Sequence, residues 1–238
     1  MGLTLTCVPG TQCDRRVWEP VWRALPAGIT PGYIAIETQT TREGMLALFA
    51  EAAARHGPLH IAAFSMGGYL SLAFALEQPE RVASLTLVCS SAFGLTGTEA
   101  AERVKIIDFL ETHPYRGMST SRMHQFVHPS HWDDPAVVEV IKAMDRDLGH
   151  DVLLAQMRET STRTSLDGAL WGIACPTLLI GADSDPFVSP ASIERMQDLI
   201  PGAQAELVVN AGHMIPLEQP GWLSARIAAF HAGIRSPD

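Results

Sequence analysis

The feature that most constrains the fold of this chain is a regular alternation of short apolar runs with longer helical runs. The apolar runs Leu3–Val8, Leu59–Phe64 and Val82–Cys89 are nearly continuous, as is typical of strands buried on both faces of a sheet. Strands that are separated by helices usually pair in parallel. The sequence therefore predicts an α/β fold with a mostly parallel sheet flanked by helices.

The same periodicity places the remaining elements of this fold. Further strands are predicted over Tyr33–Ile36, Thr177–Ile180 and Ala205–Val209. Helices are predicted over Arg15–Leu25, Arg42–Arg55, Ser65–Gln78, Pro190–Leu199 and Trp222–Ala232.

Between about Phe93 and Trp171 the alternation stops, and several amphipathic helices follow one another. One of them has a clear start at Asp134-Pro135, an N-cap residue followed by proline at the first helical position. We expect a core formed by residues 1–92 and 171–238, with residues 93–170 as a helical lid or cap over an active site. A second helical layer that only completes the core is the alternative.

Composition narrows the class of protein. The 238 residues are 47% hydrophobic and 18% charged, and the net charge is −9. An acidic surface argues against nucleic acid and anionic membranes as partners, because both are negatively charged. No signal peptide or membrane span is apparent, and the four cysteines stand singly, which favours reduced thiols. We expect a cytoplasmic protein that acts on a small molecule; the oligomeric state stays open.

The strongest local signal is the run from Leu59 to Gly68, in which a buried strand leads through Ser65 directly into a helix. A nucleophile on such a turn projects its hydroxyl from the sheet, and small residues on either side let strand and helix approach closely. The helix N-terminus adds the backbone N–H of Met66 and a dipole that favours a developing oxyanion. Ser65 is therefore predicted to be a nucleophile.

A second signal is Ala211-Gly-His213, in the loop after the last predicted strand. Together with Ile200-Pro-Gly-Ala203 and Pro216-Leu-Glu-Gln-Pro220, this region resembles the C-terminal part of the α/β-hydrolase family. The resemblance covers nearly the whole chain. The order Ser, acid, His along the chain also fits that family, and the resemblance implies that His213 is the catalytic base.

The resemblance places the catalytic acid in the loop after the preceding strand, where two candidates occur. Asp185 is followed by proline and precedes the helix start at Pro190 by a few residues, which is similar to the family's spacing. Asp183 lies nearer the strand end and is expected to be structural or to form an Asx turn. We predict that Asp185 fixes the tautomer of His213.

The turn after the first strand, which contains Pro9, Gly10 and Thr11, is similar to the family's oxyanion loop. The resemblance implies that the backbone N–H groups of Thr11 and Met66 form the oxyanion hole. The chain departs from the family pattern in having Pro9 where histidine is usual and Ala63 for the first glycine of the GxSxG motif. Family members also commonly have two strands ahead of this turn. We therefore expect a sheet of about six strands that lacks the N-terminal hairpin.

Residues of the helical insertion are candidates for substrate contacts. Phe93, Phe126 and Trp132 are predicted to line an apolar pocket, with core packing as the alternative. The histidines at positions 124, 128 and 131 lack a carboxylate or cysteine that would complete a metal site, so no metal is expected. Four arginines are either contacts for a substrate carboxylate or ordinary surface charge: Arg15, Arg16, Arg116 and Arg122.

The sequence thus predicts a serine hydrolase without metal or organic cofactor, and the resemblance points to small carboxylesterases and enol-lactonases that act on modest hydrophobic substrates. A C–C hydrolase, a thioesterase, a lyase and a cofactor-free haloperoxidase would use the same residues. A ligand-binding protein on the same scaffold is the alternative outside catalysis.

Overall fold

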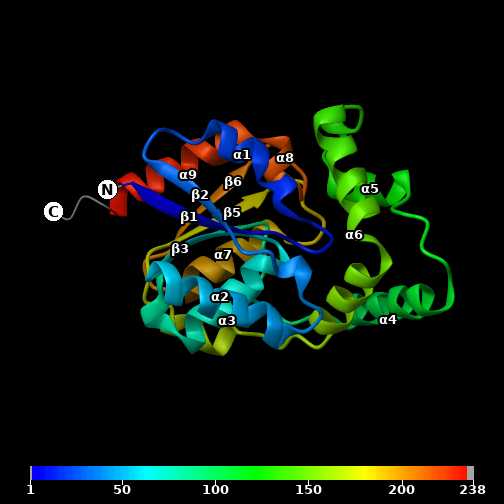
Figure 1. Cartoon of the computed structure of the whole chain (residues 1–238), viewed down its shortest axis with the longest axis horizontal. Helices are drawn as coiled ribbons and strands as arrows, with labels where there is room; N and C mark the ends of the chain where they lie inside the picture. The colour runs from blue at the N-terminus through cyan, green and yellow to red at the C-terminus, as the bar shows by residue number, and fades with distance from the viewer. Residues whose placement is uncertain (1, 235–238) are drawn as a thin grey trace.

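Six parallel strands form one sheet in the computed structural model, which describes residues 2–234 (Figure 1). The strands are β1 (Leu3–Val8), β2 (Ile29–Tyr33), β3 (Leu59–Phe64), β4 (Val82–Val88), β5 (Thr177–Ala182) and β6 (Gln204–Val208). They are ordered β2-β1-β3-β4-β5-β6, and every neighbouring pair in the described chain is parallel. The predicted fold class, an α/β-hydrolase fold with about six strands, is confirmed.

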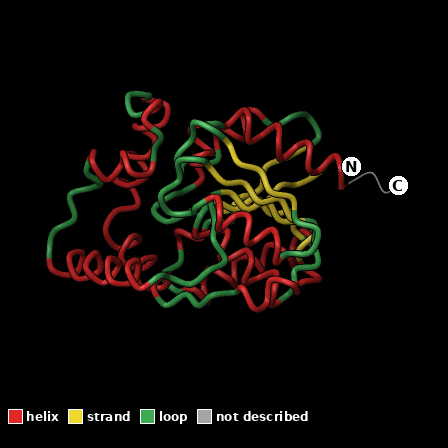
Figure 2. Tube along the Cα trace, turned by 180° about the vertical axis from the view of Figure 1, so that it is seen from behind, coloured by secondary structure: helices red, strands yellow, loops and turns green. Residues whose placement is uncertain are grey.

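Helices cover both faces of this sheet (Figures 1 and 2). One face packs against α1 (Glu19–Ala24), α8 (Ile215–Glu218) and α9 (Pro220–Ile234), and the other against α2 (Arg42–His56), α3 (Met66–Glu77) and α7 (Pro190–Leu199). Short 3-10 helices span Arg15–Val17, Ile36–Thr38, Pro79–Arg81, Pro129–His131 and Asp167–Gly172. Because both faces are covered, all but one residue of β3, all but one of β4 and all of β5 are buried, which explains their continuous apolar runs.

Two predicted elements near the N-terminus were wrong in their bounds. The second strand is Ile29–Tyr33 rather than Tyr33–Ile36, and it includes Pro31. Proline is tolerated there because β2 is an edge strand with a single neighbour. The helix predicted over Arg15–Leu25 is divided at Trp18, since Pro20 has no N–H to continue the first piece and is accommodated in the first turn of α1.

The insertion between β4 and β5 consists of α4 (Gly97–Thr112), α5 (Thr120–Phe126) and α6 (Pro135–Ser161), which lie beyond the carboxyl ends of the strands (Figure 1). The predicted start of α6 is present: the Asp134 side chain accepts a hydrogen bond from the Ala136 N–H at 2.9 Å. Helix α6 is interrupted at Gly149, whose φ of 70° and ψ of −166° are not helical. Between residues 2 and 234, no helix combines the length and apolar character needed to cross a lipid bilayer.

Candidate active site

Ser65 lies on the sharp turn between β3 and α3, with φ 50° and ψ −116°. A residue other than glycine held at positive φ costs about 1–3 kcal/mol, so the surrounding structure must impose this conformation. The following glycines explain how it does so. A Cβ at Gly67 would lie 2.4 Å from the Pro9 carbonyl oxygen, and one at Gly68 would lie 2.2 Å from Ser90 Oγ. The turn is thus enclosed on two sides and holds the half-buried Ser65 in place.

The loop after β6 brings His213 to this turn. Its Nε2 lies 3.0 Å from Ser65 Oγ, and its Nδ1 lies 2.8 Å from Asp185 Oδ2. Both His213 and Asp185 are buried. Three residues that are far apart in the sequence therefore form one continuous chain of hydrogen bonds.

Glu218 fixes the His213 loop through hydrogen bonds to its backbone. Sequence reasoning missed this residue. Its buried carboxylate accepts hydrogen bonds from the backbone N–H groups of Gly212, at 3.0 Å, and Met214, at 2.9 Å. It also accepts one from the N–H of His128 at 2.8 Å, which joins the loop to the helical insertion. The signal was present in the run from Pro216 to Pro220, where a glutamate stands between apolar residues.

Asp185 is held in its ionised form by its neighbours. Burial alone would raise the pKa of this carboxyl group, but the charge and hydrogen bond of His213 lower it. The backbone N–H groups of Phe187, at 2.8 Å, and Val188, at 3.1 Å, donate to Oδ1 and act in the same direction. The resulting pKa lies below the ordinary value, as suits a carboxylate that orients an imidazole.

Asp183, the other candidate acid, has different partners. It is exposed, and its carboxylate accepts hydrogen bonds from the N–H groups of Asn210 at 3.1 Å and Ala211 at 3.4 Å. These bonds tie the end of β5 to the start of the His213 loop. Asp183 therefore contacts the backbone that carries the histidine, whereas Asp185 contacts the histidine ring.

The turn after β1 lies directly against Ser65. A Cβ added at Gly10 would come within 3.1 Å of Ser65 Cβ, so only glycine permits this approach. On the other side of Thr11, the N–H of Gln12 donates to the side chain of Gln156 in α6 at 2.8 Å. The backbone around Thr11 is thus fixed at both ends, next to the serine.

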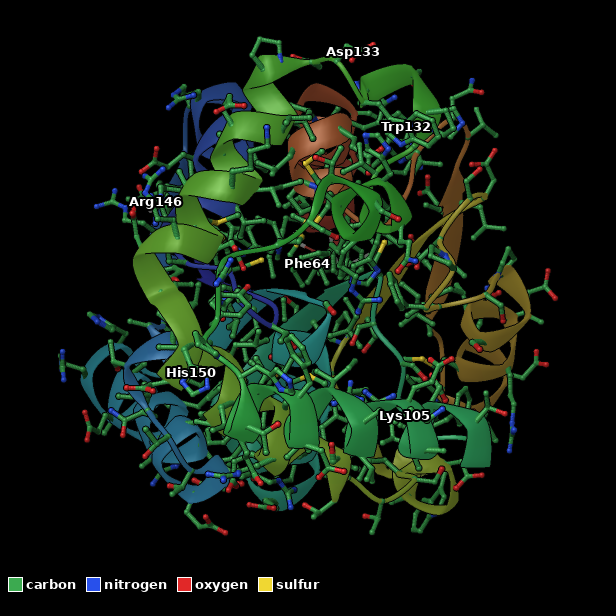
Figure 3. The ribbon with its side chains drawn as sticks, turned by 90° about the vertical axis from the view of Figure 1, so that its right-hand side faces the viewer. Phe64, Lys105, Trp132, Asp133, Arg146 and His150 are labelled. Atoms are coloured by element: carbon green, nitrogen blue, oxygen red, sulfur yellow. The ribbon has the colours of Figure 1, made fainter. Side chains whose placement is uncertain are left out.

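Aromatic rings surround His213. The ring centroids of Phe64, Phe187 and Phe126 lie 5.1, 5.2 and 6.1 Å from that of the imidazole. Of the three predicted substrate contacts, Phe126 is therefore next to the site. Trp132 instead stacks on His124 at 4.2 Å, and Phe93 contacts Arg195. Figure 3 shows Phe64 in the middle of the side that carries the insertion, with Trp132 farther out.

One group of side chains in the described chain that could hold a metal ion lies at the same site. Donor atoms of Cys89, Asp185 and His213 lie within 4.8 Å of one another. The Asp185 oxygen and His213 nitrogen, however, are only 2.8 Å apart, closer than two ligands of a metal with bonds of about 2.0–2.3 Å would be. The pair is accounted for by a direct hydrogen bond. The buried Cys89 thiol lies beside the Asp185 carboxylate, and burial raises its pKa well above the usual range.

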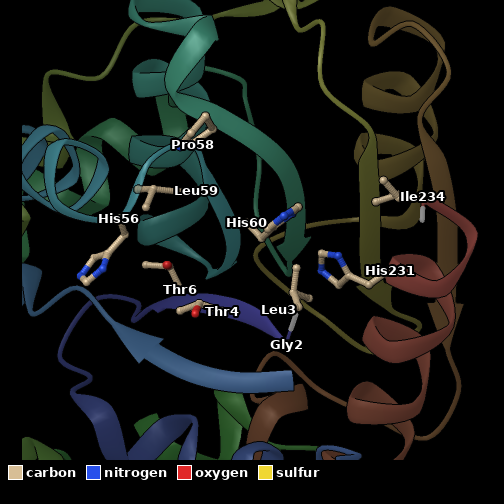
Figure 4. A pocket seen from close by; sticks show the side chains of 10 residues that line it. All are labelled: Gly2, Leu3, Thr4, Thr6, His56, Pro58, Leu59, His60, His231 and Ile234. Atoms are coloured by element: carbon tan, nitrogen blue, oxygen red, sulfur yellow. The ribbon is translucent and has the colours of Figure 1, made fainter. Parts of the chain in front are cut away.

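A cavity of about 350 Å³ opens at the opposite end of the sheet (Figure 4). Its lining includes Thr4, Thr6, His56, His60 and His231. In parallel sheets, ligands bind outside the carboxyl ends of the strands, whereas this cavity lies at the amino ends. We therefore place the candidate active site at Ser65.

Comparison with known proteins identifies the family of this chain. The sequence profile of the family described as "alpha/beta hydrolase fold" matches residues 37–220. The chain therefore belongs to the α/β-hydrolase fold family. It is similar to the carboxylesterase YbfK of Bacillus subtilis, with 29% identity over 191 residues that cover 73% of this chain and 57% of YbfK. The chain spans little more than half the length of such curated relatives.

Solved structures share the fold at lower identity. A thermophilic esterase from Thermogutta terrifontis superposes with a TM-score of 0.83 at 23% identity, covering 99% of this chain and 92% of the esterase. The enol-lactonase from Burkholderia xenovorans LB400 superposes with a TM-score of 0.85 at 16% identity, covering 98% and 92%. At these identities the likeness concerns the fold.

Proposed function

We propose that this protein is a serine hydrolase that cleaves a small ester or lactone through an acyl-enzyme on Ser65. The observation that carries the proposal is the chain of hydrogen bonds from Ser65 Oγ through His213 to Asp185, built on a turn with positive φ. Membership of the α/β-hydrolase family and the likeness to a carboxylesterase support the same reaction class.

The proposed reaction begins with neutral His213. Its Nδ1–H donates to Asp185, which leaves Nε2 free to take the proton from Ser65 Oγ as the oxygen bonds to the carbonyl carbon. His213 then gives that proton to the leaving alkoxide, and the bond from carbon to the leaving oxygen breaks. Water then attacks the acyl carbon as His213 Nε2 takes its proton. His213 returns that proton to Ser65 Oγ as the bond from the acyl carbon to Oγ breaks and the acid is released.

The oxyanion of the tetrahedral intermediate would be bound by the backbone N–H groups of Thr11 and Met66. Met66 begins α3, whose N-terminal dipole favours negative charge, and Gly10 brings the Thr11 turn against Ser65. All groups in this mechanism come from the chain itself, so it requires no cofactor.

The insertion over residues 93–170 would act as a lid that excludes water and lines the substrate pocket. Phe126 and Phe187 lie on the His213 side of this pocket, where they would contact an apolar part of the substrate. Phe93 and Trp132 would contribute only after the insertion moves. The buried free thiols Cys7, Cys13 and Cys89 suit a reducing, cytoplasmic location.

Labelling with a fluorophosphonate probe tests the covalent mechanism. Wild type should be labelled and should hydrolyse 4-nitrophenyl esters, whereas Ser65→Ala should do neither. Ser192→Ala serves as the matched control, because it removes a serine hydroxyl on α7 whose partner is Ser189, outside the Ser65 turn. If intact wild type is not labelled and Ser65→Ala behaves like wild type, the hydrolase hypothesis fails. The alternative, a ligand-binding protein on the same scaffold, then takes its place. A screen of esters, lactones, thioesters and C–C substrates then separates the reactions available to the same triad.

A further inference from the structure

Three arginines from three segments of the helical insertion are without carboxylate partners. Arg103 lies in α4, Arg122 in α5, and Arg163 just after α6. Most other arginines are paired, for example Arg16 with Asp147 at 2.7 Å and Arg195 with Asp167 at 2.9 Å, although Arg116 also has no ion pair among the described residues. Within residues 2–234, no carboxylate oxygen lies within 4.0 Å of the three, which we call the arginine cluster. In a chain with a net charge of −9, such unpaired positive charge is unexpected.

The arginine cluster borders the candidate active site on two sides. The guanidinium carbon of Arg163 lies 5.8 Å from the ring centroid of Tyr69, one helical turn after Ser65. That of Arg122 lies 4.8 Å from Phe126 and 5.6 Å from Phe187, the rings beside His213.

Arg103 is bound to α6 by a hydrogen bond. Its Nη1 donates to Thr160 Oγ1 at 2.5 Å. The nearest compensating charge is Glu99, but its carboxylate accepts the Thr96 N–H at 2.7 Å in the capping box of α4. Glu99 also acts to raise the pKa of Arg163, and Glu102 that of Arg122, whose Nη1 donates to Gln125 Oε1 at 2.7 Å. These carboxylates act from a distance, and within residues 2–234 none of them forms an ion pair with the cluster.

Arg103 lies within electrostatic range of the other two arginines of the cluster. Burial lowers the pKa of Arg103 to about 10, and the positive charges of Arg163 and Arg122 act in the same direction. Burial also lowers the pKa of Arg163, and its buried Nε has no hydrogen-bond acceptor. Arg103 and Arg163 are half-buried, whereas Arg122 is exposed. Like charges that lie near one another are unfavourable, most of all where they are half-buried, and an anion placed between them would reduce this cost.

We propose that Arg103, Arg122 and Arg163 bind a carboxylate carried by the substrate, so that the preferred substrate is an ester or lactone with a free acid group. This inference rests on the proposed function. The planar guanidinium fork matches a carboxylate with two parallel hydrogen bonds, and limited water access strengthens them. The aromatic rings beside His213 would contact the apolar atoms between the acid group and the reacting carbonyl.

Two matched ester pairs test the proposal. In the first, the acid is on the acyl side: 4-nitrophenyl hydrogen adipate against 4-nitrophenyl hexanoate. In the second, it is on the alcohol side: 4-carboxyphenyl hexanoate against 4-carbamoylphenyl hexanoate. Wild type should prefer the acidic member of at least one pair by about tenfold or more in kcat/KM.

Substitution should remove that preference. Arg103→Gln, Arg122→Gln and Arg163→Gln should each lower kcat/KM for the acidic ester about tenfold and leave the neutral ester within about twofold. Arg55→Gln removes the same charge from an exposed site on α2 and is the matched control. Thermal melts establish that each variant is folded.

The outcomes separate this proposal from the hydrolase itself. Equal rates for both members of both ester pairs would overturn the anion site, as would a preference that survives all three substitutions. In either case, labelling of Ser65 would still support the hydrolase. If wild type is not labelled, the hydrolase fails, and calorimetric titration with adipate decides the anion site alone. Adipate should then bind wild type and Arg55→Gln but not the cluster variants; equal or absent binding overturns the proposal.

Discussion

Asp183 and Asp185 are two residues apart in one loop, yet they have different surroundings. Asp183 is exposed and bonded to the backbone of Asn210 and Ala211. Asp185 is buried, with one oxygen on the imidazole of His213 and the other on two backbone N–H groups. The chemistry available to a carboxylate depends on these partners, so the two residues should respond differently to the same substitution.

We expect Asp185→Asn to lower kcat/KM for ester hydrolysis by about three to four orders of magnitude. The amide N–H would face His213 Nδ1 and favour the tautomer in which Nε2 carries the proton and is unable to accept one from Ser65. Asp183→Asn should cost less than about tenfold, because it weakens only the support of the loop. Equal and mild losses in steady-state kinetics of both variants would contradict the assignment of the acid.

Asp185 should also make stability depend on pH. Its pKa is depressed in the folded protein, so the folded state favours the ionised form. This contribution is complete above the unfolded pKa of about 3.9 and is lost as the pH falls through the lower folded pKa. Urea unfolding between pH 6 and 3 should therefore show a larger loss for wild type than for Asp185→Asn. If the free energy of unfolding falls equally with pH in both proteins, Asp185 does not contribute to the pH dependence of stability.

At the scale of elements, the interruption of α6 is coupled to the turn beside Ser65. The Gln12 side chain donates to the Gly149 carbonyl at 2.9 Å and to that of Asp145 at 3.3 Å, where the break leaves helix carbonyls without their usual partners. In return, the Gln156 side chain accepts the Gln12 N–H. Helix and turn therefore satisfy several of each other's buried polar groups, although Gln12 Oε1 and Gln156 Nε2 remain buried without a hydrogen-bond partner.

Replacing the buried Gln156 by leucine should lower the free energy of unfolding by about 1–3 kcal/mol, because the Gln12 N–H would remain buried without an acceptor. Urea unfolding measures this value. Gln204→Leu, at an exposed position on β6, should change it by no more than about 0.5 kcal/mol. Similar values for both variants would mean that the bond between helix and turn adds no stability.

At the scale of the whole molecule, the sheet core and the insertion differ in how much they bury. In α3, ten of twelve residues are buried, whereas Leu110 is the buried residue of α4 and Met123 that of α5. Val104 and Phe109 in α4 are more than half exposed. Few buried contacts mean that local opening costs little free energy.

Amide hydrogen exchange should therefore be at least tenfold faster in α4 and α5 than in α3 and β3. Mass spectrometry of peptides from each element measures the difference. A covalent fluorophosphonate adduct on Ser65 should slow exchange in the insertion more than in the core, as expected for a lid. Uniform protection across all four elements would contradict a mobile insertion.

Much of the fold was predictable because it depends on local patterns. Continuous apolar runs identified the buried strands, and Asp134-Pro135 identified the start of α6. The bounds of predicted elements were wrong where tertiary contacts changed the conformation that a residue adopts. Pro31 is accepted in β2 only because that strand is at the edge of the sheet, and the break at Gly149 is stabilised by Gln12 from a distant turn.

By itself, the sequence determined the α/β architecture and the turn at Ser65, because backbone preferences and apolar periodicity act over a few residues. The order of serine, acid and histidine acquired its meaning from the resemblance to the α/β-hydrolase family. Only the tertiary structure decided which aspartate reaches His213, how Glu218 supports its loop, and that Arg103, Arg122 and Arg163 have no carboxylate partner within residues 2–234. Hydrogen bonds and charges act across space over a few ångströms, and the fold alone determines which residues come that close.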